Sequence, residues 1–246
     1  MGIVSKSESY IPPFRVQGAG AIILAGGLGT RLRSVVAGIP KCMAPVAGKP
    51  FLHYVMNYLT EQGINKFIFS LGYKHEKISS WLSAEYPLYD IQISVEEDPL
   101  GTGGAIRHAC SKVTDKTVFV VNGDTLFSAD LGKLGEFHTG HGAICTLSLK
   151  PMVDFDRYGV VELNEDLSVA SFIEKQHFDR GFINGGVYAM NTSSFMEEDL
   201  PEKFSFEKDY LEKFYTKRKI FGLVQDRYFI DIGVPEDYER AGRELK

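Results

Sequence analysis

The sequence lacks an excess of basic residues. It contains 27 Lys and Arg against 32 Asp and Glu, which gives a formal net charge of −5. Proteins that bind nucleic acids or anionic membranes through a general surface usually carry the opposite sign, so we expect neither partner. An anionic small molecule would instead need a local cluster of Lys and Arg.

The sequence also lacks a cysteine motif and a long apolar run. Cys42, Cys110 and Cys145 show no metal-ligand spacing, and an odd number of thiols suits a reducing compartment. No apolar run reaches the length of a membrane span. The start, MGIVSKSESYIPPF, has no hydrophobic signal region, and Lys6 stands where myristoylation needs Ser or Thr. We therefore expect a cytoplasmic protein.

Apolar stretches alternate with segments of helical period up to about residue 142. The predicted strands are residues 20–26, 66–72, 91–97 and 117–124, and the predicted helices are residues 51–62, 75–86 and 102–111. This alternation predicts an α/β, Rossmann-like fold, in which a mostly parallel sheet is flanked by helices. Ligands of such sheets bind beyond the carboxyl ends of the strands.

The pattern changes at about residue 143. The strings AICTLSLK, GVVEL, VASFIEK and FINGGVYAMN read as strands with few helices between them, which predicts antiparallel pairs in a smaller lobe. The chain is expected to close with a helix at 207–217, strands at 219–224 and 227–231, and a helix at 235–245. Residues 1–18 are expected to form an N-terminal tail, and residues 19–246 a single domain.

The most informative stretch is LAGGLGTRLRSVVAGIPK, which ends at Lys41. Its glycines allow the backbone to approach a phosphate closely, and N–H groups at a helix start would complete an anion site. Arg31 and Lys41 can neutralise triphosphate charge. The alternative is a glycine-rich turn beside two surface cations. On the first interpretation, the nucleotide contacts Leu24, Ala25, Gly26, Gly27, Gly29 and Thr30.

Two other phosphate-binding loops fit this chain less well. A dinucleotide fingerprint needs a third glycine where Leu32 stands. A Walker loop needs glycine at Met43 and Ser or Thr at Pro50.

The string GGLGTRLRSVVAGIPKCMAPVAGKPFL resembles the signature of the sugar-phosphate nucleotidyltransferases, or nucleotide-sugar pyrophosphorylases. EEDPLGTGGAI, NGDTLF, FIEK, NGGVY and FIDIGVPEDY follow in the order expected of that family, and the resemblance covers nearly all of residues 19–241. Ser34, Cys42 and Gln176 depart from it where proline is common, which affects the subfamily more than the reaction. RLRSVV and SFEKDYL look most like the branch that guanylylates D-glycero-α-D-manno-heptose 1-phosphate.

The resemblance implies a GT-A-like fold that transfers a nucleotidyl group from a nucleoside triphosphate to a sugar 1-phosphate. Residues 19–142 would form the nucleotide-binding part and residues 143–230 the sugar-binding lobe. Asp124 and Asp231, each at the end of an apolar strand, would bind Mg²⁺. An aspartate there is costly unless it is paired or bound to a cation, and helix capping is the alternative.

The expected reaction needs no general base, because a sugar 1-phosphate is largely dianionic at pH 7, with its second pKa near ~6. Cations and positioning dominate the barrier when two anions react, so we expect a single in-line displacement that releases pyrophosphate. The expected catalytic residues are Arg31, Lys41, Asp124 and Asp231.

The FIEK string and the NGG turn would bind the acceptor. Lys175 would hold the sugar phosphate, while Glu174 and the turn would meet sugar hydroxyls, with the glycines leaving room for the ring. A surface Glu–Lys pair is the alternative for FIEK. The expected contacts of the sugar phosphate are Gly159, Glu174, Lys175, Asn184 and Gly185.

Two further strings carry weaker signals. His138 and His141 in HTGH read as a polar helix end and not as metal ligands. Lys208 and Asp209 in SFEKDYL either join the sugar pocket or lie on a solvated helix face.

The base is predicted to be guanine, with Glu96 as its reader. Glu96 lies three residues before Pro99, where uridylyl- and thymidylyltransferases often have glutamine. Two carboxylate acceptors match the N1–H and N2–H₂ donors of guanine, and Gly101 and Thr102 would lie beside the nucleotide. Alternatively, Glu96 and Glu97 are solvent-facing charges at a strand end.

Other readings stay open at this point. A non-catalytic nucleotide-sugar sensor would be free to lose the charged residues that this chain retains. Molybdopterin-type nucleotidyltransferases have a shorter Arg-to-Lys interval. Uridine, thymidine or cytidine nucleotides with another sugar, and a homo-oligomeric state, are further alternatives.

Overall fold

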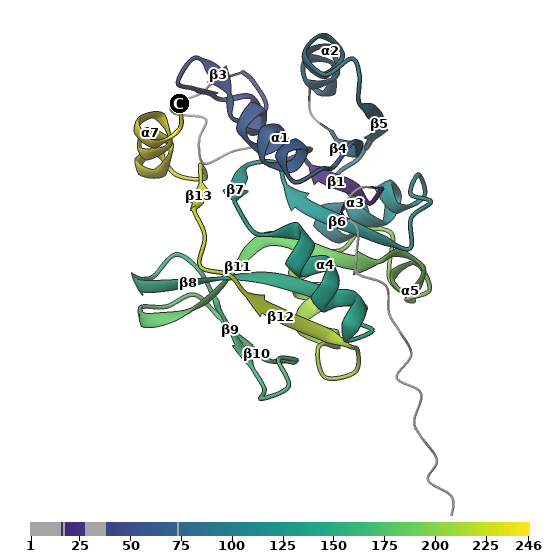
Figure 1. Cartoon of the computed structure of the whole chain (residues 1–246), viewed down its shortest axis with the longest axis vertical. Helices are drawn as coiled ribbons and strands as arrows, with labels where there is room; N and C mark the ends of the chain where they lie inside the picture. The colour runs from purple at the N-terminus through teal and green to yellow at the C-terminus, as the bar shows by residue number, and fades with distance from the viewer. Residues whose placement is uncertain (1–15, 17, 28–37, 73) are drawn as a thin grey trace, which may run out of the picture.

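A seven-stranded sheet forms the centre of the computed structural model, which describes residues 16, 18–27, 38–72 and 74–246 (Figure 1). The sheet order is β12-β8-β11-β6-β1-β4-β5, with β11 antiparallel to both of its neighbours and the other neighbouring pairs parallel. The mostly parallel sheet is therefore confirmed. Its strands are β1 (Gly20–Leu24), β4 (Lys66–Leu71), β5 (Asp90–Val95), β6 (Thr117–Asn122), β8 (Cys145–Phe155), β11 (Phe178–Asn191) and β12 (Ile220–Val224).

Helices cover both faces of this sheet, as predicted. Successive side chains of a strand point to opposite faces, and β1 divides its side chains between two cores. Ala21 and Ile23 belong to one core, and Ile22 belongs to the other. The first core includes residues of α1 (Phe51–Glu61), α2 (His75–Glu85), α4 (Leu131–Gly140) and α7 (Pro235–Glu244). The second includes residues of α3 (Gly101–Cys110), α5 (Thr192–Met196) and η3 (Phe206–Leu211).

The helix expected at residues 207–217 is divided. It consists of the π-helix η3 followed by α6 (Glu212–Phe214). The Ser205 hydroxyl accepts a hydrogen bond from the Lys208 backbone N–H at its start. The rings of Phe206 and Tyr210 stack at 5.5 Å in the second core. This segment therefore presents two large aromatic side chains, four residues apart, to the second core.

The strands after residue 143 are partly shared with the central sheet. β8 and β11 pair along almost their full lengths, and their inner halves also pair with β12 and β6. Their outer halves extend beyond the sheet, near the hairpin of β9 (Val160–Leu163) and β10 (Val169–Ile173). This end of the molecule lies opposite α2 in Figure 1. The change of pattern thus marks antiparallel strands, and the sheet itself is not divided at residue 143.

Short ribbons complete the fold. β7 (Thr125–Phe127) pairs antiparallel with β13 (Phe229–Asp231), which sets Asp231 opposite Thr125. The 3-10 helix η2 (Lys41–Met43) leads into the hairpin of β2 (Pro45–Val46) and β3 (Lys49–Pro50). The ribbons bring Asp124, Asp231 and Lys41 to the same end of the sheet. No helix in the described part of the chain is long and apolar enough to cross a membrane.

The HTGH string only partly fits the expected polar helix end. His141 is exposed, but His138 is 2% exposed, and its Nδ1 lies 3.0 Å from the Thr146 hydroxyl. Burial lowers the pKa of His138 to about 4. The expectation is therefore wrong for His138, which α4 turns into the core against β8.

This histidine makes stability fall on acidification. The pKa of His138 is lower in the folded chain than the ordinary value of 6.5, so the unfolded chain binds the proton more readily and stability is lost as the pH falls from about 6.5 toward 4. We expect this loss to be about 2–3 kcal/mol between pH 7.5 and pH 4.5. Urea titrations at both pH values measure the free energy of unfolding. Its change between pH 7.5 and pH 4.5 should be smaller for His138→Gln than for the wild type. The exposed control His141→Gln should keep the wild-type difference, and an unchanged difference in His138→Gln would contradict the prediction.

Candidate active site

The carboxyl ends of β1, β4, β5 and β6 lie along one edge of the sheet, because these strands are parallel. The chain leaves β1 after Leu24 and continues between the two neighbouring strands. The Ala25 N–H donates to the Ser70 carbonyl, and the Gly123 N–H donates to the Leu24 carbonyl, both at 2.9 Å. A Cβ on Gly123 would lie 3.0 Å from the Leu24 oxygen. Glycine at this position therefore suits the close approach of the NGD turn to β1.

Lys41 lies between the two predicted metal-binding aspartates. Its Nζ is 2.7 Å from Asp124 Oδ2 and 3.4 Å from Asp231 Oδ1. The Lys41 side chain is 14% exposed, so the ammonium is largely removed from solvent. The structure thus brings together three of the four predicted catalytic residues. Arg31 lies outside the described residues and remains a prediction.

The electrostatics of this cluster follow from burial and proximity. Burial raises the pKa of Asp231, and the nearby Lys41 ammonium only partly offsets that effect. Burial alone would lower the pKa of Lys41, but the two carboxylates outweigh it and raise the pKa. The lysine is therefore a permanent cation at neutral pH. The Gly233 N–H donates to Asp231 Oδ1 at 2.8 Å and helps to hold that carboxylate.

The two aspartates fit a hydrated divalent cation. Their oxygens converge on one positive charge, the Lys41 ammonium, which marks where a cation is stabilised. Mg²⁺ commonly takes one or two carboxylates and completes its shell with water and phosphate oxygens. No group of three or more His, Cys, Asp or Glu residues suited to a metal occurs in the described ranges. The donor set therefore suits a metal that arrives with a phosphorylated substrate.

The structure describes only part of the predicted phosphate loop. Gly26 packs against the end of β4, where a Cβ would lie 3.2 Å from the Gly72 nitrogen. Leu24 ends β1, and Ala25, Gly26 and Gly27 follow it at the edge of the sheet that carries the acidic pair. Nucleotide contact by these four residues remains a prediction. Gly29 and Thr30 lie outside the described residues, and their role remains a prediction.

Glu96 is not a free charge at a strand end. Its Oε1 accepts a hydrogen bond from the Ser70 hydroxyl at 2.8 Å, and its Oε2 accepts one from the Leu100 N–H at 3.0 Å. The carboxylate therefore fixes the turn between β5 and α3. Carboxylate oxygens have about two acceptor sites each, so capacity for another donor remains. Sequence reasoning missed this structural role, because neither partner is visible in a local pattern.

Gly101 and Thr102 contact Phe204 and the SFEKDYL segment that follows it. Gly101 has φ +74°, and a Cβ there would lie 2.5 Å from the Phe204 carbonyl oxygen. The Thr102 hydroxyl donates to Glu207 Oε2 at 2.7 Å and accepts from the Phe206 N–H at 2.8 Å. Both residues thus dock η3 onto α3. Nucleotide binding by them remains a prediction, with the Thr102 hydroxyl already engaged.

Glu174 and Lys175 lie on the exposed segment between β10 and β11. In the described part of the chain, neither side chain takes part in a hydrogen bond or ion pair, so the alternative of a surface Glu–Lys pair is not observed. Gly159 lies against the end of β10, where a Cβ would be 2.6 Å from the Ile173 oxygen. The structure therefore places Gly159 beside the FIEK segment. Contact of these residues with a sugar phosphate remains a prediction.

The expectation that the NGG glycines leave room for a sugar ring is wrong. A Cβ on Gly185 would lie 2.2 Å from Phe127, and a Cβ on Gly186, whose φ is +72°, would lie 2.6 Å from Asn122 Nδ2. The space beside these glycines is occupied by protein atoms and not left for a sugar ring. Asn184 is also held in place, since its Nδ2 donates to the Tyr188 hydroxyl at 2.8 Å. Contact of this turn with sugar hydroxyls remains a prediction.

The SFEKDYL charges differ in their surroundings. Asp209 accepts from the Ser205 N–H at 2.9 Å and pairs with Lys213 at 2.8 Å, which is a helix-stabilising role. Lys208 is exposed. Asp209 therefore fits the alternative of a solvated helix face. The exposure of Lys208 agrees both with that alternative and with a place in the sugar pocket.

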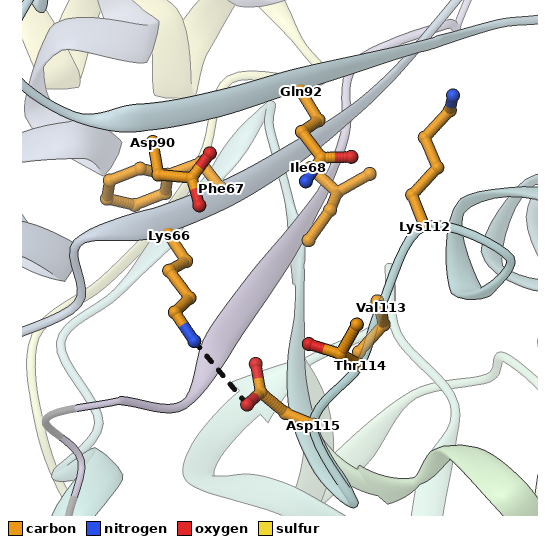
Figure 2. A pocket seen from close by; sticks show the side chains of 9 residues that line it. All are labelled: Lys66, Phe67, Ile68, Asp90, Gln92, Lys112, Val113, Thr114 and Asp115. Carbon is orange, nitrogen blue, oxygen red and sulfur yellow. Dashed lines mark ion pairs between the residues drawn. The ribbon is translucent and has the colours of Figure 1, made fainter.

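One hollow among the described residues lies away from this site. Figure 2 shows a small pocket of about 80 Å³ at the opposite edge of the sheet, where Lys66 and Asp90 begin β4 and β5. An ion pair of 3.6 Å joins Lys66 to Asp115, and Lys112 extends away from it (Figure 2). Ligand pockets usually measure ~300–1,000 Å³, so this one is too small for a nucleotide. A wider groove of about 730 Å³ borders Glu96 and runs along α3 as far as His108.

The chain belongs to the nucleotidyl transferase family, whose model matches residues 20–246. It is 52% identical over 226 residues to D-glycero-alpha-D-manno-heptose 1-phosphate guanylyltransferase of Aneurinibacillus thermoaerophilus, covering 92% of this chain and 98% of that one. It is 48% identical over 218 residues to the protein of the same name from Campylobacter jejuni, covering 89% and 96%.

Solved structures agree with these similarities. HddC from Yersinia pseudotuberculosis, complexed with GMP-PN, matches with a TM-score of 0.83 and 38% identity, covering 93% of this chain and 100% of that chain. A putative glucose-1-phosphate thymidylyltransferase from Bacillus anthracis, at 22% identity and a TM-score of 0.77, shows the shared fold alone. The predicted family, fold class and reaction class are confirmed. The roles of individual site residues remain predictions.

The ion pairs of Lys41 with Asp124 and Asp231 should contribute to the free energy of unfolding. Lys41→Met leaves two carboxylates without their shared cation, and we expect a loss of about 1–3 kcal/mol at pH 7.5. Because a raised carboxylate pKa costs stability only where the group is ionised, the loss should shrink as the pH falls toward 4. Millimolar Mg²⁺ should also restore part of it. Denaturant titrations of wild type and variant, with and without Mg²⁺, measure both effects.

Lys112→Met is the matched control, since this lysine lies at the far edge of the sheet (Figure 2). It should change neither the pH dependence nor the response to Mg²⁺. A loss in Lys41→Met that is equal at all pH values and insensitive to Mg²⁺ would show that Lys41 acts through packing alone.

Proposed function

We propose that this protein transfers a guanylyl group from GTP to D-glycero-α-D-manno-heptose 1-phosphate, giving a GDP-sugar and pyrophosphate. The observation that carries the proposal is the convergence of Lys41, Asp124 and Asp231 at the end of the sheet. The names of two relatives that match over nearly their whole length support the choice of sugar. HddC, solved with GMP-PN, supports guanine.

The chemistry is a displacement at the α-phosphorus of GTP. A phosphate oxygen of the acceptor forms the new P–O bond, the bond between the α-phosphorus and the bridging oxygen breaks, and pyrophosphate leaves with the electron pair. Asp124 and Asp231 would hold Mg²⁺, which neutralises phosphate charge when bound. Lys41 supplies a fixed cation beside the same carboxylates. Such preorganised charge lowers the barrier without a general base.

The two substrates would approach from opposite sides of this cluster. Residues 24–31 and Glu96 would bind GTP, and the segment with Glu174 and Lys175 would bind the acceptor. Lys175 is exposed, and its flexible ammonium suits a phosphate that must arrive and leave in each turnover. A cytoplasmic location fits such soluble, charged substrates and belongs to the same proposal.

Glu96 is proposed to read guanine while it holds the turn. Its carboxylate is already oriented by Ser70 and Leu100, and its remaining acceptor sites match the N1–H and N2–H₂ donors of guanine. Gln at this position can preserve the turn, since its oxygen can accept from Leu100 and its amide can donate to the Ser70 hydroxyl. It cannot accept both guanine donors as well.

Nucleotide preference tests this assignment. The wild type should prefer GTP over UTP, dTTP and CTP in pyrophosphate-release assays with heptose 1-phosphate. Glu96→Gln should reduce that preference by about 1–3 kcal/mol, because guanine donors are left unmatched. Glu97→Gln, at the neighbouring exposed position, serves as the control. A native preference for another base rejects guanine, and an unchanged GTP preference in Glu96→Gln rejects Glu96 as its reader.

Acceptor binding tests the role of Lys175. Losing a hydrogen bond to a charged group costs about 1.5–3 kcal/mol, so Lys175→Ala should raise the KM for the sugar 1-phosphate about ten- to a hundredfold. The KM for GTP should stay near the wild-type value. Lys217→Ala removes an exposed lysine elsewhere and should alter neither constant. Equal losses for both substrates would assign Lys175 to the triphosphate or to the structure.

A further inference from the structure

A second cation, Arg157, lies in the turn between β8 and β9, near the acidic cluster formed by Asp124 and Asp231. Arg157 donates through Nη2 to Asp237 Oδ2 in α7. The arginine side chain is 43% exposed, whereas the Asp237 side chain is 10% exposed. The anchor is thus buried while the guanidinium remains accessible.

The neighbouring tyrosine fixes where this turn lies. The ring of Tyr158 packs edge-on against Phe229, with 5.8 Å between the ring centroids. Phe229 and Asp231 are two residues apart in β13, so their side chains leave the same face of the strand. The turn that bears Arg157 therefore lies over the face from which the Asp231 carboxylate projects.

Charge interactions agree with this placement. Burial raises the pKa of Tyr158, and the charge of Asp231 raises it further. Burial alone would lower the pKa of Arg157, but Asp237, Tyr158 and Asp231 together raise it. Both side chains of the turn therefore experience the charge of the Asp231 carboxylate.

The other end of the turn contacts the predicted acceptor segment. Gly159 lies so close to the end of β10 that a Cβ would be 2.6 Å from the Ile173 oxygen. Glu174 and Lys175 follow Ile173 directly. The turn therefore spans the space between the acidic cluster and Lys175, where the acceptor phosphate would lie.

Asp237 does not depend on Arg157 alone for its counter-charge. Arg240 Nη2 lies 3.1 Å from Asp237 Oδ1. If Arg157 turned away, the buried carboxylate would keep one arginine and would avoid the large cost of an unpaired buried charge. Arg157 can thus exchange partners at modest cost.

We propose that Arg157 binds the phosphate of the acceptor sugar 1-phosphate, and that Asp237 acts as the positioning residue that presents it. The proposal rests on the proposed function, because it needs a sugar phosphate as acceptor. A planar guanidinium has five donors and matches phosphate oxygens in a bidentate manner. With Lys175 on the other side, it would reduce the repulsion between two anionic substrates.

Steady-state kinetics with both substrates test the proposal. Arg157→Met should raise the KM for heptose 1-phosphate about ten- to a hundredfold and leave the KM for GTP unchanged. Arg157→Lys should recover part of the loss, because it keeps the charge without the fork. Asp237→Asn should lower the Tm but raise the acceptor KM less than Arg157→Met, since the arginine is still present. Arg180→Met, an exposed arginine of β11, should match the wild type.

Calorimetric titration of heptose 1-phosphate into the protein separates the two proposals. Normal wild-type turnover with normal acceptor binding in Arg157→Met would overturn the role of Arg157 and leave guanylyl transfer intact. Equal effects of Arg157→Met and Asp237→Asn on the Tm and on both KM values would show a purely structural latch, which also overturns it. A wild type that neither binds nor guanylylates any sugar 1-phosphate would overturn both proposals.

Discussion

Two carboxylates that share one ammonium set the geometry on which the rest of the site depends. Lys41 is 83 residues from Asp124 and 190 residues from Asp231 in sequence, yet its Nζ contacts both. A poorly solvated charge is stable only with a partner, so the three segments that carry these residues are held at one end of the sheet. The β7–β13 ribbon supplies the remaining constraint, because it pairs Asp231 with Thr125.

The sequence predicts the central sheet well because its signals are local. An apolar strand that ends in a charged residue is visible in TVFVVNGD, and Asp124 lies where this pattern places it. The pairing of β7 with β13 is different, since strands of three residues carry too little pattern to specify a distant partner. The ion pair of Lys41 is likewise a tertiary contact, so the local pattern indicates a triphosphate partner for this lysine and does not indicate the aspartates.

The hydrogen bonds of Glu96 and the packing of Gly185 show the same limit within the site. The residue type at each position was informative, since a carboxylate has acceptors and glycine allows close approach. The partner was not predictable: Glu96 meets Ser70 and Leu100, and Gly185 meets Phe127. A residue type restricts what a position can do, whereas the surrounding fold decides which of these possibilities is used.

The C-terminal helix α7 connects the two sides of the proposed reaction. The Tyr238 hydroxyl donates to the Pro45 carbonyl at 2.5 Å, four residues after Lys41. The adjacent residue of the same helix, Asp237, accepts from Arg157 beside the acceptor segment. Because α7 follows β13 directly, it also fixes the chain that carries Asp231. A helix with no predicted catalytic residue therefore connects three segments of the site, those that follow Lys41, carry Asp231 and carry Arg157.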